Sequence, residues 1–130
     1  MTTHHGAEGP VQVVIADDSA SLRCLVAQLV TSLGGEVVGE VPDGYAAIVA
    51  AVSLEPDMVI MDWHMPDLDG LAATAAIRDR RPGVEVIAYS ATDDGDVAER
   101  FLRAGACTYI DKMDTAGLEA ELARRAAPTL

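Results

Sequence analysis

The chain has 130 residues, half of them hydrophobic, which is enough for one domain with a substantial core. Its formal net charge of −12 at pH 7 argues against binding of nucleic acid or of an anionic membrane by this domain alone, because both are polyanions. That charge suits a cation and a protein partner with a basic patch. No stretch of the sequence approaches the ~20 apolar residues that a membrane-spanning helix needs.

The two cysteines and the two ends of the chain carry little chemistry. Cys24 and Cys107 stand in no metal-ligand spacing, and each lies within an expected apolar element. We therefore expect reduced thiols in the core of a cytoplasmic protein. Residues 1–10 lack the apolar segment of a signal peptide and are predicted to be a flexible tail. The domain is expected over residues 11–127, with a short C-terminal tail over 128–130.

Five strand-like segments alternate with five segments of helical pattern, separated by short turns. The expected strands are Val11–Ala16, Glu36–Val41, Met58–Asp62, Val84–Tyr89 and Cys107–Ile110. The expected helices run from Ser19 or Ala20 to Leu33, Asp43 to Leu54, Asp69 to about Arg80, Asp93 or Asp94 to Ala104, and Thr115 to Ala127. Strict alternation with short connections predicts an α/β fold, a doubly wound parallel sheet with helices on both faces.

The first expected helix shows an apolar stripe at helical spacing, which should face the core. The members of this stripe are Leu22, Leu25, Val26, Leu29, Val30 and Leu33.

Acidic side chains stand at the ends of two expected strands. Asp17 and Asp18 follow the first strand, and Asp62 ends the third. The carboxyl ends of parallel strands share one edge of the sheet, which is where open α/β folds bind their ligands. Three carboxylates gathered there need a cation, and oxygen ligands select a hard one, Mg²⁺ first.

A hydroxyl and an ammonium are expected at the same edge, because Ser90 follows the fourth strand and Lys112 the fifth. In phosphoryl transfer a carboxylate can attack phosphorus, while Mg²⁺, a lysine and a hydroxyl can hold the phosphoryl oxygens. Taken singly, Ser90 could be an ordinary loop hydroxyl, Lys112 a surface charge, and Asp17 or Asp18 a helix cap. Taken together with three acids, they indicate a site for phosphoryl transfer.

From Val11 to Ala127 the chain resembles the receiver domain of two-component response regulators. The matching segments are Ile15–Ser19, Pro42–Ala47, Pro56–Asp57, Met61–Pro66 with Gly70, Tyr89–Ala91, Gly105–Ala106 and Tyr109–Lys112. Each segment is a weak signal alone, but all of them in this order at strand ends are very specific. The resemblance implies five strands in the order 2-1-3-4-5 with five helices on two faces.

The resemblance also implies the roles of the acidic residues. Asp62 would be the phosphoacceptor. Asp18, Asp62 and the backbone carbonyl of His64 would bind Mg²⁺ directly, and Asp17 would help through a water molecule. The phosphodonor would be a phosphohistidine on a sensor histidine kinase or on a histidine phosphotransfer protein.

A second implied group of residues would convert phosphorylation into a change of surface. Ser90 would close on the phosphoryl group, Lys112 would pair with its oxygens, and Tyr109 would be an aromatic switch. The surface formed by the fourth helix, fifth strand and fifth helix would then bind a downstream protein or a second copy of the chain. The apolar residues expected on this surface, with Tyr109, are Ala98, Phe101 and Leu102.

One position departs from the family pattern, because Met113 follows Lys112 where a proline after a cis bond is common. A cis bond before a residue other than proline costs about 2.5–4 kcal/mol, so we expect a trans bond here.

Three functions stay open. A stand-alone receiver is favoured, because little sequence follows the last helix; such a protein is a phosphoacceptor and not an enzyme, with at most slow self-catalysed transfer and loss of its phosphoryl group. The chain could instead be the receiver part of a DNA-binding response regulator without its output domain. A Mg²⁺-dependent aspartyl phosphatase is disfavoured, because one common type needs Asp-x-Asp after the first strand, whereas Asp17 and Asp18 are adjacent.

Overall fold

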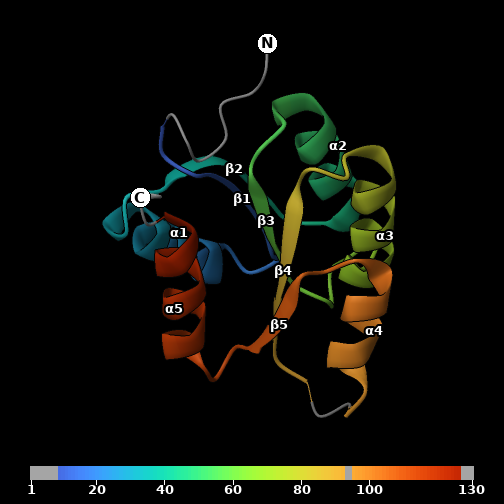
Figure 1. The fold of residues 1–130 in the computed structure, drawn as a ribbon. Helices are drawn as coiled ribbons and strands as arrows, with labels where there is room; N and C mark the ends of the chain where they lie inside the picture. The colour runs from blue at the N-terminus through green and yellow to red at the C-terminus, as the bar shows by residue number, and fades with distance from the viewer. Residues whose placement is uncertain (1–8, 93–94, 127–130) are drawn as a thin grey trace.

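A computed structural model of the chain describes residues 9–92 and 95–126 and shows one parallel sheet between two layers of helices (Figure 1). The strands are β1 (Gln12–Ala16), β2 (Glu36–Val41), β3 (Met58–Met61), β4 (Glu85–Ser90) and β5 (Thr108–Asp111). The helices are α1 (Ala20–Ser32), α2 (Gly44–Leu54), α3 (Gly70–Arg80), α4 (Val97–Ala104) and α5 (Thr115–Ala126). The strand order is β2-β1-β3-β4-β5, which confirms the predicted fold and sheet order.

The two helical layers follow from strand alternation, because successive side chains of a strand point to opposite faces of the sheet. Val13 and Ile15 of β1 pack in a cluster with residues of α1 and α5. Val14 and Ala16 pack on the other face, in a cluster with residues of α2, α3 and α4. Figure 1 shows α1 and α5 on one side of the sheet and the other three helices opposite. Strands buried on both faces explain why the central segments read as continuous apolar runs.

Several predicted boundaries shift by a residue or two, and some fall outside the described residues. β3 ends at Met61, so Asp62 is the first residue beyond the strand. The predicted start of the fourth helix at Asp93 or Asp94 lies outside the described ranges, and α4 itself begins at Val97. The predicted helix end at Ala127, the C-terminal tail and most of the N-terminal tail also lie outside them, so the tails stay predictions.

One expectation about the core was wrong, and a second failed at a single residue. Cys24 and Cys107 are free thiols, as expected, but both are exposed instead of buried. The predicted α1 stripe faces the core at every position but one: Val26 and Val30 are buried, and Leu22, Leu29 and Leu33 pack against the same cluster, while Leu25 is 62% exposed. A residue adjacent to a buried one lies about 100° around the helix, which here is beyond the part of α1 that the sheet covers. No helix in the described ranges combines the length and apolar character needed to cross a bilayer.

Two close backbone approaches fix the loop between β3 and α3, one to the start of α2 and one to the residue after Asp62. The N–H of Gly44 donates to the carbonyl of Leu68 at 3.0 Å, and the N–H of Gly70 donates to the carbonyl of Trp63 at 2.8 Å. A Cβ atom on Gly70 would lie 1.8 Å from the carbonyl oxygen of Asp62, so no side chain fits there. The loop that follows Asp62 is therefore fixed by its packing.

We predict that Gly70→Ala lowers the free energy of unfolding by about 1–3 kcal/mol or more, since the added methyl group meets backbone that cannot easily move. Urea denaturation of the purified protein measures this change. Gly83→Ala is the matched control, because a Cβ there meets nothing within 4 Å. It should change stability by no more than about 0.5 kcal/mol. Equal stability of the two variants would contradict the observed packing of the loop.

Candidate functional site

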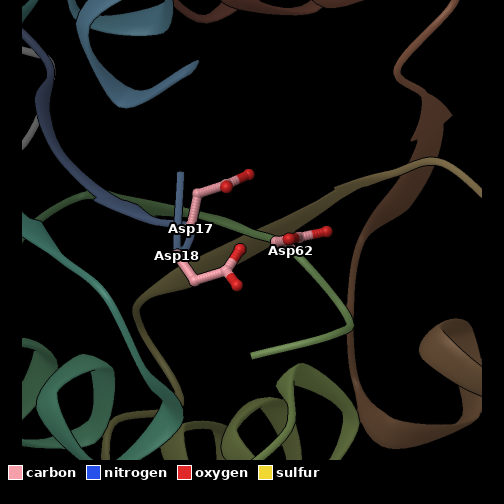
Figure 2. Close-up of side chains that lie close together, drawn as sticks. All are labelled: Asp17, Asp18 and Asp62. Atoms are coloured by element: carbon pink, nitrogen blue, oxygen red, sulfur yellow. The ribbon is translucent and has the colours of Figure 1, made fainter. Parts of the chain in front are cut away.

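The three predicted carboxylates lie together at the carboxyl edge of the sheet. β1 and β3 are hydrogen-bonded neighbours with Ala16 opposite Met61, so the next residues, Asp17 and Asp62, are brought side by side. Figure 2 shows Asp17 and Asp18 at the end of β1 and Asp62 beyond the end of β3. One oxygen from each of the three lies within 4.8 Å of the others. Asp17 and Asp62 are only 4% and 6% exposed, whereas Asp18 is exposed to solvent.

Three donors hold the Asp62 carboxylate. The N–H of Trp63 and the hydroxyl of Ser90 each donate to Asp62 Oδ1 at 2.8 Å, and Lys112 Nζ lies 3.3 Å from the same oxygen. Within the described residues, the hydrogen bonds to this carboxylate all fall on Oδ1. The geometry leaves Oδ2 as the oxygen that could bind a cation or attack an electrophile.

Lys112 bridges the two buried acids, because its Nζ also lies 2.8 Å from Asp17 Oδ2. The other oxygen of Asp17 accepts from the N–H of Ser19 at 2.9 Å. The hydroxyl of Ser19 itself caps α1, accepting from the N–H of Leu22 at 3.2 Å. The interpretation of Asp17 or Asp18 as a mere cap of this helix is therefore unnecessary.

The charged groups at the site shift one another's pKa values. Burial raises the pKa of Asp62, and the charge of Asp17 raises it further, while the bonds from Ser90, Lys112 and Trp63 oppose the rise without cancelling it. Burial by itself lowers the pKa of Lys112, but the hydrogen bond to Asp17 and the charges of both acids outweigh burial and raise it. The acids thus favour the charged form of Lys112, and burial makes the charged form of Asp62 more costly.

Ser90 links Asp62 to Tyr109. Ser90 is buried at the end of β4, and its carbonyl accepts from the hydroxyl of Tyr109 at 2.9 Å and from the N–H of Lys112 at 3.0 Å. Burial raises the pKa of Tyr109, helped by the charges of Asp111 and Asp62, so its hydroxyl stays protonated and able to donate. Ser90 thus joins the two residues, with its carbonyl bonded to Tyr109 and its hydroxyl bonded to Asp62.

The residues expected on the α4–β5–α5 surface are not equally accessible. Leu102 is 49% exposed, and Ala98 and Tyr109 are half-buried. Phe101 is fully buried and stacks on Tyr109, with ring centroids 6.1 Å apart. Phe101 therefore supports the surface from beneath and does not present apolar area to a partner in this conformation.

The Lys112–Met113 bond is trans, as expected, and no cis peptide bond occurs among the residues that the structure describes. Met113 is 89% exposed. Two aspartates shape this turn in place of a proline: Asp111 Oδ1 accepts from the N–H of Met113 at 2.7 Å, and Asp114 Oδ1 accepts from the N–H of Gly117 at 2.9 Å. Asp114 thereby satisfies an N–H in the first turn of α5.

Two contributors to the site escaped the sequence analysis. Trp63 supplies the backbone N–H that holds Asp62, a role that any residue type except proline could fill and that no side-chain pattern indicates. Arg23 of α1 donates from Nη1 to the carbonyl of Asp17 at 2.5 Å and lies 3.6 Å from Glu40. The position of Arg23, one turn into α1, was a usable signal. Side chains of a helix tilt toward its N-terminus, so a long side chain there can reach back to Asp17.

The oxygen donors at this edge fit a hard divalent cation. Asp17, Asp18 and Asp62 offer only carboxylate oxygens, with neither histidine nor cysteine in the cluster. Such a donor set favours Mg²⁺ or Ca²⁺ over zinc. Against the three acids, Lys112 supplies one positive charge, so the cluster itself remains short of positive charge.

Comparisons with known proteins agree with this geometry. The response regulator receiver domain matches residues 13–123. The transcriptional regulatory protein PdtaR of Mycobacterium tuberculosis is 38% identical over 111 residues, which is 85% of this chain and 54% of PdtaR. The chemotaxis protein CheY of Thermotoga maritima is 34% identical over 101 residues, 78% of this chain and 84% of CheY. The receiver domain of NarL from M. tuberculosis superposes with a TM-score of 0.80 at 31% identity, covering 89% of this chain and 92% of that one.

We predict that Asp62→Asn stabilises the protein at neutral pH in Mg²⁺-free buffer, because it removes a buried charge while Lys112 keeps its contact with Asp17. The ordinary pKa of the carboxyl is 3.8 and the folded-state pKa is higher. The native state of the parent therefore loses stability as pH rises through the folded-state pKa. The advantage of Asp62→Asn should accordingly shrink as pH falls toward 4, as urea denaturation at several pH values measures. An advantage that grows toward acid would contradict the raised pKa.

Proposed function

The chain belongs to the receiver-domain family of two-component response regulators, and from this membership we propose that it accepts a phosphoryl group on Asp62 from a phosphohistidine donor. One observation carries the proposal: a buried carboxylate whose Oδ1 is held by Trp63, Ser90 and Lys112 and whose Oδ2 is left for reaction. In the proposed step, Oδ2 of Asp62 attacks phosphorus, the P–N bond of the donor breaks, and the imidazole nitrogen keeps the electron pair.

We assign the cation to the acidic cluster. Asp18, Asp62 and the carbonyl of His64 would hold Mg²⁺ directly, with Asp17 acting through a water molecule. When bound, Mg²⁺ supplies charge that neutralises phosphoryl oxygens. The exposure of Asp18 supports its assignment as a direct ligand, because an entering ion meets this carboxylate first and the cluster stays open on that side.

The positions of Lys112 and Ser90 support the roles proposed for them in holding the transferred group. Both contact Asp62 Oδ1 in the structure, so each needs only a small movement to reach an oxygen of a phosphoryl group on Oδ2. Lys112 would offer a charge pair and Ser90 a hydrogen bond. These interactions would favour the phosphorylated conformation only if they are stronger there than in the free protein.

The output of the domain is proposed to run through α4, β5 and α5. Tyr109 would respond to the position of Ser90, and the surface around Ala98 and Leu102 would then bind a downstream protein or a second copy of the chain. We expect no direct binding of nucleic acid or membrane, since the chain carries a net charge of −12. Free thiols at Cys24 and Cys107 support a reducing, cytoplasmic location.

Two arrangements of the whole protein remain as candidates. The chain spans about half the length of PdtaR, a transcriptional regulatory protein, which supports a receiver joined to an output domain. It spans 84% of the chemotaxis protein CheY of T. maritima, which supports a stand-alone receiver. We propose the stand-alone form, acting as a phosphoacceptor and not as an enzyme with a separate substrate; the length of the encoded protein decides between the two.

We predict that Mg²⁺ binds without phosphate and changes the fluorescence of Trp63, the only tryptophan of the chain. Asp18→Asn should weaken binding about tenfold or more, because it removes a charged ligand. Asp67→Asn is the matched control: it removes one exposed acid from the loop after β3, at a left-handed position that asparagine also tolerates. Equal affinity of Asp18→Asn and the parent would refute the assignment of the cation site.

We predict that acetyl phosphate with Mg²⁺ adds one phosphoryl group to the protein and that the group is labile to hydroxylamine, as an acyl phosphate should be. Intact-mass spectrometry measures the addition, and Asp62→Asn should abolish it. Labelling of Asp62→Asn at the level of the parent would place the phosphoacceptor elsewhere.

We predict that beryllofluoride with Mg²⁺ shifts amide resonances of α4 and of Tyr109 as well as those of the loops around Asp62. The expected reason is the path of hydrogen bonds from Asp62 through Ser90 to Tyr109. Ser90→Ala removes the hydroxyl and should leave the Asp62 loops responsive while reducing the shifts in α4. Shifts confined to the loops in the parent would mean that phosphorylation is signalled by another route.

A further inference from the structure

Trp63 connects the phosphoacceptor with two helices. Its N–H donates to Asp62 Oδ1, and its carbonyl accepts from the N–H of Gly70, the first residue of α3, both at 2.8 Å. Its side chain is 9% exposed and lies in the same hydrophobic cluster as Val97 and Phe101 of α4. The peptide that holds Asp62 is therefore anchored through the indole of the same residue.

A cation from α4 lies over this indole. The guanidinium carbon of Arg100 is 5.3 Å from the centre of the Trp63 ring, within the ~6 Å of a cation–π contact. The ring of His64 stacks on Trp63 as well, with centroids 4.2 Å apart and planes 22° from parallel. The stack thus joins α4 to both residues that follow Asp62.

We propose that Arg100 is a positioning residue, which acts through Trp63 to hold the loop that carries the N–H donor to Asp62 and the carbonyl of His64. The inference rests on the function proposed above and adds a residue to it. A movement of α4 that carries Arg100 away removes the cation from the indole, so the peptide that holds Asp62 Oδ1 loses one of the contacts that fix its position. Because such coupling is reciprocal, an occupant of the site that shifts this loop also changes the contact of Arg100.

The burial of Trp63 separates this role from one in general stability. The indole is covered mainly by core residues, and Arg100 itself is an exposed residue of α4. Removing the guanidinium therefore leaves the core packed and takes away the contact with the indole. Electrostatics alone acts in the opposite direction, because loss of a positive charge near the acidic cluster strengthens the binding of a cation.

The test compares Arg100→Gln with Arg103→Gln. Arg103 is in the same helix and pairs with Glu99 at 3.1 Å on the surface, so its replacement removes the same charge without touching Trp63. Mg²⁺ affinity is followed by Trp63 fluorescence, phosphorylation by acetyl phosphate is followed by intact mass, and thermal unfolding is recorded for each protein.

Arg100→Gln should weaken Mg²⁺ binding about two- to fivefold, the size expected of an exposed cation–π contact. Arg103→Gln should match the parent, and Arg100→Lys should fall between the two because it keeps the charge without the planar stacking group.

Unchanged or tighter Mg²⁺ binding by Arg100→Gln overturns the proposal. If Arg100→Gln unfolds at a lower temperature than the parent, a second measurement on the parent protein tests the proposal. The Nε–H resonance of Arg100, which the indole ring shifts, must move when Mg²⁺ and beryllofluoride bind. A resonance that does not move overturns the proposal. A parent protein that binds no Mg²⁺ and accepts no phosphoryl group instead contradicts the proposed function of the whole site.

Discussion

The pairing of one lysine with two buried aspartates governs the site at the edge of the sheet. Asp17 and Asp62 are almost fully buried, and a buried charge is costly unless it is paired and hydrogen-bonded. Lys112 contacts both acids, and the N–H groups of Ser19 and Trp63 satisfy one oxygen of each. Asp18 adds a third carboxylate to the cluster, so three negative charges lie beside one ammonium. That shortage of positive charge is the physical basis for expecting a divalent cation.

The parallel sheet makes this pairing possible. Asp17, Asp62 and Lys112 come from β1, β3 and β5 or just beyond them, and the register of neighbouring strands places their ends at one edge. The N–H of Asp62 donates to the carbonyl of Ala16, and the N–H of Lys112 donates to the carbonyl of Ser90, both at 3.0 Å. The ladder of hydrogen bonds therefore extends one residue beyond the strands, and it holds the backbone of Asp62 and Lys112 in place.

Two routes connect Asp62 Oδ1 with the helical layer around α4. One runs through the hydroxyl of Ser90 to its carbonyl and on to Tyr109. The other runs through the N–H of Trp63 to its indole and on to Arg100. The first depends on a side chain that can turn toward a phosphoryl oxygen, while the second depends on the position of the backbone after Asp62. In the proposed function, a change at Asp62 would reach α4 through the Ser90 hydroxyl and through the loop after Asp62.

The sequence alone determined the fold class and the membership of the acidic site. Strict alternation of strand-like and helical segments predicts the parallel sheet. The carboxyl ends of parallel strands meet at one edge, and this rule brings together the side chains that follow the strands: Asp17, Asp18, Asp62, Ser90 and Lys112. The tertiary structure alone decided how deeply each side chain lies and which of its atoms are engaged. Leu25 and Cys24 belong to an apolar helix yet are exposed, while Phe101 is buried beneath the surface it was expected to form. Helical periodicity gives the direction of a side chain to within about a third of a turn, but its burial depends on the neighbours that cover it. The contact of Arg100 with Trp63 joins residues 37 positions apart in elements whose relative placement only the packed core defines, so no local pattern could reveal it.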